Sequence, residues 1–119
     1  MDKLVFLVDD TDSVLTLGAS ILEDDYRVLT MSSALKMFSL LEKKQPDMIL
    51  MDLEMPEMNG FDAVAKLREN TEWSSIPVLF LTGHIDDTVL SRAAELRALG
   101  VHNKSDISTT LLDRIRELI

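Results

Sequence analysis

The stretch MILMD at residues 48–52 places four apolar residues directly before an aspartate. A short, continuous apolar run is typical of a strand that is buried on both faces of a parallel sheet. Similar runs occur at residues 4–8 (LVFLV) and 77–81 (PVLFL), and a more polar run at residues 27–31 is expected to form an exposed strand. These runs predict a parallel β-sheet with a strand ending at Asp52.

The segments between the runs carry apolar residues at helical spacing, which predicts helices that cross over between parallel strands. In the second helix we expect Ala34, Leu35, Phe38 and Leu41 to face inward, and the fourth helix should extend to about Leu99. The residues expected to cap or begin these helices are Asp12 or Ser13, Ser32 or Ser33, Asp86 with Asp87, and Ser108. Alternating strands and helices predict an α/β protein with a doubly wound open sheet.

Length and composition narrow the range of functions. A chain of 119 residues is the size of one small domain, and we expect residues 1–119 to form it. A net charge of −9 argues against nucleic acid as a direct partner, since such binding needs a basic surface. There are no cysteines, and no segment approaches the roughly 18 apolar residues that cross a bilayer. We therefore expect a cytoplasmic domain with no membrane partner.

Polar residues follow the predicted strands at the positions where parallel sheets form binding sites. Asp9 and Asp10 follow the first strand, Asp52 ends the third, and Thr82 follows the fourth. Lys104 follows a fifth strand whose sequence pattern is weak. Each residue alone could be a helix cap, a turn residue or a solvated side chain. Together they would gather three carboxylates at one sheet edge, which requires a cation. Oxygen ligands of this kind suit Mg²⁺.

Such a site has a definite chemistry. With the metal bound, the carboxylate of Asp52 can act as a nucleophile toward a phosphoryl group and give an acyl phosphate. The metal and the Lys104 ammonium would neutralise the phosphoryl oxygens. The Thr82 hydroxyl could donate a hydrogen bond to one of these oxygens, and Gly83 would leave the space beside it uncrowded.

The order Asp9-Asp10, Asp52, Thr82, Lys104 resembles that of the receiver domains of two-component response regulators. The loop MPEMNG at residues 55–60 and IPV at residues 76–78 resemble that family too. The resemblance implies a flavodoxin-like five-stranded sheet of order 2-1-3-4-5 with five helices. It also implies Mg²⁺ held by Asp9, Asp10, Asp52 and the backbone carbonyl of Glu54.

The function implied by the resemblance is that of a phosphoacceptor rather than an enzyme. A sensor histidine kinase or a phosphotransfer protein would phosphorylate Asp52, and Thr82 would relay a conformational change. The face formed by helix four, strand five and helix five would then bind a second copy or an output partner. By the same resemblance, Glu54 and His84 are candidates for tuning dephosphorylation, with solvated rim positions as the alternative.

One segment departs from the family pattern. Val101-His102-Asn103 stands where receivers usually carry an aromatic and two apolar residues before the lysine, and Ser105 replaces the usual proline. We expect a short or irregular fifth strand. Either the fourth helix ends early and residues 96–103 supply a substitute strand, or the strand is truncated and Lys104 is loosely placed. Phosphorylation should survive, with the family's aromatic-coupled switching absent or rewired.

Two other functions fit parts of this pattern. Phosphatases of the haloacid dehalogenase type also use an aspartyl nucleophile, a Thr or Ser, a Lys and Mg²⁺, but their nucleophile ends the first strand and they generally need more chain. The second alternative is a receiver-like binding module that no longer signals by phosphate. Such modules usually lose members of the acidic pocket, whereas this chain keeps all three carboxylates.

Overall fold

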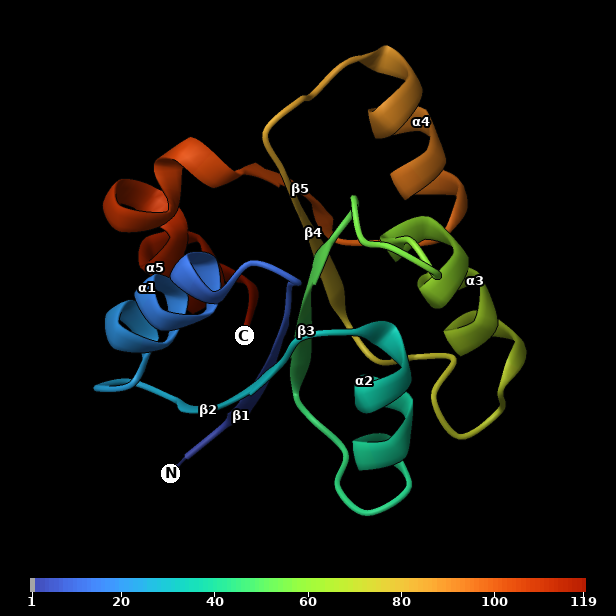
Figure 1. Cartoon of the computed structure of the whole chain (residues 1–119), viewed down its shortest axis with the longest axis horizontal. Coiled ribbons are helices and arrows are strands. Elements are labelled where there is room, and N and C mark those ends of the chain that lie inside the picture. Colours follow the sequence, from blue (N-terminus) through green and yellow to red (C-terminus); the bar gives the residue numbers. More distant parts are fainter. Residues whose placement is uncertain (1) are drawn as a thin grey trace.

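The computed structural model describes residues 2–119, which form one central sheet with helices on both faces (Figure 1). The strands are β1 (Leu4–Val8), β2 (Arg27–Met31), β3 (Met48–Asp52), β4 (Val78–Thr82) and β5 (Gly100–Asn103). The helices are α1 (Asp12–Leu22), α2 (Ala34–Leu41), α3 (Gly60–Glu69), α4 (Asp87–Glu95), the 3₁₀ turn η1 (Lys104–Asp106) and α5 (Ile107–Leu118).

All strand pairs are parallel, and the order is β2-β1-β3-β4-β5. The predicted fold is therefore confirmed, including the short fifth strand. Every residue of β1, β3 and β4 is buried, as the continuous apolar runs indicate, whereas the edge strand β2 is only partly buried. Because these strands are parallel, the carboxyl ends of β1, β3 and β4 lie side by side along the carboxyl-terminal edge of the sheet, where the predicted site lies.

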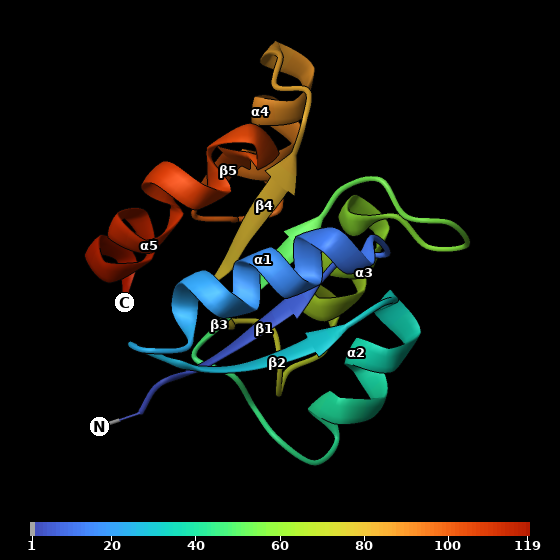
Figure 2. The same ribbon diagram turned by 60° about the vertical axis from the view of Figure 1, so that its left-hand side comes forward.

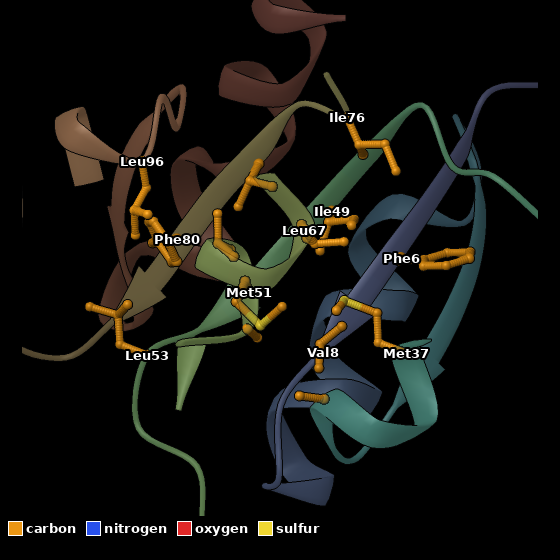
Figure 3. Packing of buried hydrophobic residues seen from close by; sticks show 14 of the residues in the cluster. Phe6, Val8, Met37, Ile49, Met51, Leu53, Leu67, Ile76, Phe80 and Leu96 are labelled. Atoms are coloured by element: carbon orange, nitrogen blue, oxygen red, sulfur yellow. The ribbon is translucent and has the colours of Figure 1, made fainter. Parts of the chain in front are cut away.

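Alternate side chains of the strands feed two apolar cores. Phe6, Ile49 and Phe80 point into the core on the side of α2, α3 and α4 (Figure 3). Val5, Leu50 and Leu79 lie in the second core, under α1 and α5. Figure 2 shows α1 and α5 side by side over one face of the sheet. Burial on both faces makes the sheet a rigid platform for the residues at its edge.

The helix starts follow the prediction in two cases and depart from it in two. Ser33 caps α2 by accepting a hydrogen bond from Lys36 N, and Asp86 caps α4 by accepting one from Val89 N. The prediction for α1 was wrong, because Thr11 occupies the N-cap without a side-chain hydrogen bond. The prediction of Ser108 for the last helix was also wrong: η1 leads directly into α5, with Asp106 at the N-cap.

The predicted inner face of α2 was wrong in one position. Leu35 is 57% exposed, and Met37 is the residue that is fully buried. Phe38, on the same helix, packs against Trp73 with their ring centroids 5.8 Å apart. Both aromatic rings line a surface pocket of about 500 Å³ together with Met58, which belongs to the loop between β3 and α3.

The end of α4 was predicted too late. The helix ends at Glu95 because Arg97 adopts a left-handed conformation, with φ of 58°. The Arg97 N–H bonds to the Ala94 carbonyl and the Ala98 N–H to the Ala93 carbonyl, the pattern of a Schellman motif. Of the two accounts of the fifth strand, the early end of α4 is observed, but the strand spans Gly100–Asn103 rather than residues 96–103. In residues 2–119, no helix has the length and apolar character needed to span a bilayer.

Candidate functional site

Three carboxylates meet at the carboxyl edge of the sheet. Asp9 follows β1 and is fully buried, Asp52 ends β3 and is 1% exposed, and Asp10 is exposed at the rim. One carboxylate oxygen from each lies within 4.8 Å of the others. Parallel pairing of β1 with β3 produces this geometry, because it aligns Val8 with Met51 and so brings the two strand ends together.

Lys104 lies among these carboxylates. It is the first residue after β5, and its Nζ atom is 2.9 Å from Asp9 Oδ2 and 2.9 Å from Asp52 Oδ1. The Asn103 side chain fixes the turn at this point by accepting hydrogen bonds from the Ser105 backbone N–H and hydroxyl. The expectation that Lys104 could be loosely placed was therefore wrong.

The carboxylate oxygens differ in what they bind. Oδ1 of Asp9 accepts a hydrogen bond from Thr11 N at 2.8 Å, and Oδ1 of Asp52 accepts one from Glu54 N at 3.2 Å. Within residues 2–119, the buried Oδ2 of Asp52 has no hydrogen-bond partner, and the buried Oδ2 of Asp9 has only its ion-pair contact with Lys104. Two buried, under-satisfied anionic oxygens beside Asp10 fit a hard divalent cation such as Mg²⁺.

The electrostatics of the site follow from its burial. Burial raises the pKa of Asp52 to about 6, helped by the negative charge of Asp9 and opposed by Lys104 and by the Glu54 N–H. Burial alone would lower the pKa of Lys104, but attraction to Asp9 and Asp52 outweighs it and the pKa is raised. Lys104 therefore stays charged at neutral pH, while Asp52 carries a charge that its surroundings only partly compensate.

Thr82 lies at the end of β4 and is 2% exposed. Its hydroxyl accepts a hydrogen bond from His84 N at 3.2 Å and lies 3.3 Å from the His84 carbonyl, to which it donates. Among residues 2–119, and apart from its chain neighbours, no atom lies within 4 Å of the place where a Cβ on Gly83 would be. In this state the Thr82 hydroxyl is held by its own loop.

The remaining predicted residues lie at the rim. Glu54 is exposed, and its backbone N–H rather than its side chain is tied to Asp52. The His84 side chain is 76% exposed and lies 3.0 Å from Asp86 Oδ2. The fold therefore gathers Asp9, Asp10, Asp52 and Lys104 into one site. The side chains of Glu54 and His84 do not contact a carboxylate of that site.

Sequence reasoning missed the role of Gly60. A Cβ at this position would lie 2.3 Å from the Asp52 carbonyl oxygen, so only glycine lets α3 begin against the end of β3. The Gly60 N–H also donates to the Leu53 carbonyl. Asn59 as the helix cap just before a glycine could have signalled this close approach.

The comparisons with known proteins agree with this geometry. The profile of the family described as "Response regulator receiver domain" matches residues 5–116. The chain belongs to this family. As a receiver domain it is part of two-component signalling, and its structure is similar to that of the chemotaxis protein CheY4 of Vibrio cholerae, with a TM-score of 0.93 and 26% identity over the whole of both chains.

Two relatives place the receiver domain within longer proteins. This chain is 30% identical to the response regulator protein TmoT of Ectopseudomonas mendocina over 116 residues. The aligned region covers 97% of this chain and 52% of TmoT. The chain is 32% identical over 92 residues to protein RcaC of Microchaete diplosiphon, which covers 77% of this chain and 14% of RcaC. The chain thus spans about half or less of the length of these two relatives.

Proposed function

We propose that this receiver domain accepts a phosphoryl group on Asp52 from a phosphohistidine of a sensor histidine kinase or a phosphotransfer protein. The observation that carries the proposal is the buried Oδ2 of Asp52, which has no hydrogen-bond partner among residues 2–119 and belongs to a carboxylate in contact with Lys104. A buried carboxylate whose charge is only partly compensated keeps a lone pair for attack on phosphorus, and the adjacent Lys104 ammonium can neutralise the incoming phosphoryl oxygens. The compartment proposed is the cytoplasm.

In the proposed step, a carboxylate oxygen of Asp52 attacks the phosphorus atom. The O–P bond forms as the N–P bond of the phosphohistidine breaks, and the imidazole nitrogen keeps the electron pair and takes up a proton from solvent. Lys104 is held 2.9 Å from Asp52 Oδ1 and can shift its ammonium to a phosphoryl oxygen. The domain is a phosphoacceptor that assists its own phosphorylation and dephosphorylation, not a multiple-turnover enzyme.

Asp9, Asp10, Asp52 and the backbone carbonyl of Glu54 would hold Mg²⁺. When bound, Mg²⁺ supplies positive charge that neutralises the phosphoryl oxygens. The donor set consists of oxygen atoms alone. In the described part of the chain, the buried Oδ2 of Asp52 has no hydrogen-bond partner, and the buried Oδ2 of Asp9 contacts only Lys104. These properties support Mg²⁺ over a softer metal such as Zn²⁺ or Cu²⁺, which would favour nitrogen or sulfur ligands.

Thr82 and Gly83 provide the proposed switch. A phosphoryl group on Asp52 offers the Thr82 hydroxyl a stronger acceptor than the His84 carbonyl, which it now contacts at 3.3 Å. Rotation toward the phosphoryl group would release the loop after β4, and the open space at Gly83 permits it. The change would reach the face formed by α4, β5 and α5, through which a second copy or an output partner would bind.

Glu54 and His84 are proposed to tune the lifetime of the acyl phosphate from the rim. The half-life should change by at least about twofold in Glu54→Asn, because a side chain beside the phosphoryl group orders or repels the attacking water. Equal half-lives in Glu54→Asn and wild type would remove Glu54 from the site. The same comparison with His84→Ala tests His84.

Intact-mass analysis after incubation with acetyl phosphate and Mg²⁺ tests the central proposal. The expected result is one hydroxylamine-labile phosphoryl adduct that is absent in Asp52→Asn and retained in the control Asp24→Asn, at an exposed acid. No adduct at saturating donor would favour a binding module that works without phosphate. Multiple turnovers of a chromogenic phosphomonoester would instead favour a phosphatase.

A further inference from the structure

Strand β5 is poorly suited to the position that it holds. It has four residues, Gly100–Asn103, lies at an edge of the sheet, and pairs only with β4. Val101 is its one apolar side chain, so little hydrophobic packing fixes its register. Yet Lys104, the next residue, is placed within 2.9 Å of two carboxylates.

Arg68, near the end of α3, anchors the chain just before β5. Its guanidinium group donates hydrogen bonds to backbone carbonyls only: Nε to Leu96 at 2.8 Å, Nη1 to Ile76 at 2.8 Å and Ser74 at 3.2 Å, and Nη2 to Arg97 at 3.4 Å. Burial, together with the charge of Arg97, lowers the pKa of Arg68. A guanidinium group satisfied by four carbonyls fixes two backbone segments relative to each other.

Two of these carbonyls mark where α4 ends. Leu96 and Arg97 follow the last helical residue, where carbonyls have no partner within the helix. By binding them, Arg68 holds the left-handed turn at Arg97 in place. The chain then joins the sheet two residues later, where Leu99 N donates to the Val78 carbonyl at 2.7 Å. Arg68 thus fixes the starting point of β5.

Arg114, on α5, holds β5 from the other side. Its Nη1 donates to the Val101 carbonyl at 2.6 Å and lies 3.2 Å from His102 Nδ1. Its guanidinium group packs over Gly100, where a Cβ would lie 2.5 Å from Nη2. In Figure 1, β5 lies between α3 and α4 on one side and α5 on the other. Arg68 therefore holds the segment just before β5, and Arg114 holds β5 itself, from opposite faces of the sheet.

We propose that Arg68 and Arg114 are positioning residues that set the register of β5 and thereby place the Lys104 ammonium at Asp52. They act through backbone carbonyls, in place of the apolar side chains that this strand lacks. Their effect on phosphoryl transfer rests on the proposed function, whereas their effect on β5 does not. Neither arginine touches the carboxylates, so both act only through Lys104.

The first test is the rate of phosphoryl uptake from acetyl phosphate in single and double variants. Arg68→Met and Arg114→Met should each slow uptake by about threefold or more, but by less than about 1.5-fold in a Lys104→Ala background, as expected of residues that act through Lys104. Arg68→Lys should not restore the rate, because one ammonium cannot bind four carbonyls. Equal slowing in both backgrounds, or no slowing, would overturn the proposal.

Matched controls are Arg92→Met on α4 and Arg116→Met on α5, whose side chains pair with Glu95 and Asp25 at the surface. Both should leave the uptake rate unchanged.

Amide hydrogen exchange of the unphosphorylated protein gives a second readout. Exchange at Val101–Lys104 should rise in Arg68→Met and Arg114→Met and not in the controls. A rise there in a protein that takes up no phosphoryl group would refute the proposed function and keep the positioning role. Unchanged exchange at β5 would refute the positioning role itself.

Discussion

The Lys104 ammonium lies 2.9 Å from Oδ1 of Asp52, so the receiver domain already holds one cation against its phosphoacceptor. The contact joins the residue after β5 to the last residue of β3, with β4 between these strands. It compensates part of the charge of a buried carboxylate and leaves Oδ2 without a hydrogen-bond partner in residues 2–119. The resting carboxylate is therefore only partly neutralised.

Replacing Lys104 should leave the buried carboxylates without a counter-charge. We expect Lys104→Met to lower the free energy of unfolding by about 1–3 kcal/mol in metal-free buffer, below the value for a fully buried pair because the lysine side chain is 25% exposed. Mg²⁺ should stabilise the variant more than the wild type. Urea unfolding with and without Mg²⁺ measures both effects, and Lys66→Met, at an exposed position, serves as the control.

Replacing Asp52 should have the opposite effect at neutral pH. The pKa of Asp52 rises from 3.8 in the unfolded chain to about 6 in the folded domain. As the pH rises, the unfolded chain therefore releases this proton at a lower pH than the folded domain does. The free energy of unfolding consequently falls as the pH rises through about 6. We expect Asp52→Asn to raise the free energy of unfolding by on the order of 2 kcal/mol at about pH 7.5 without metal, and by little near pH 4. A gain independent of pH would contradict this assignment.

Gly60 and Gly83 provide a matched pair of substitutions. A Cβ at Gly60 would meet the Asp52 carbonyl oxygen at 2.3 Å, whereas at Gly83 it would meet no atom of the described residues within 4 Å beyond its chain neighbours. We expect Gly60→Ala to cost about 2 kcal/mol or more of unfolding free energy and to slow phosphoryl uptake, while Gly83→Ala stays within about 0.5 kcal/mol. Thermal unfolding and the intact-mass assay measure these effects. Similar losses in both variants would show that backbone contact at Asp52 is not the cause.

Arg97 offers a stabilising substitution. Its φ of 58° is strained for a residue with a Cβ and suits glycine, the usual residue after a helix end of this kind. Arg97→Gly should therefore raise the free energy of unfolding by about 0.5–1 kcal/mol, despite the greater entropy of the unfolded chain. Arg92→Gly, inside α4, should lower it by about 1 kcal/mol. Chemical denaturation of the two variants should give changes of opposite sign.

The buried strands and the acids after them were readable from the sequence because they rest on local patterns. Each of β1, β3 and β4 is a continuous apolar run, and parallel pairing forces Asp9 and Asp52 to one edge. The position of Lys104 directly after the last strand also predicted that it lies at this edge, although the sequence pattern of that strand is weak.

Other features depend on contacts between distant residues. The end of α4 lacks a glycine, and the side chain that binds its last carbonyls, Arg68, lies 28 residues from Leu96 in the chain. Leu35 and Met37 are both apolar in one short helix, so spacing alone could not decide which of them faces the core. The direction of the Thr82 hydroxyl depends on the loop that follows it.

The pocket beside α2 has a practical consequence. Trp73 is the only tryptophan of the chain, and it shares this pocket with Met58 from the loop that links Asp52 to α3. A rearrangement of that loop alters the polarity around the indole ring, and indole fluorescence responds to such a change. The emission of the unlabelled domain can therefore serve as an internal optical probe, read in real time, of events at the opposite end of that loop.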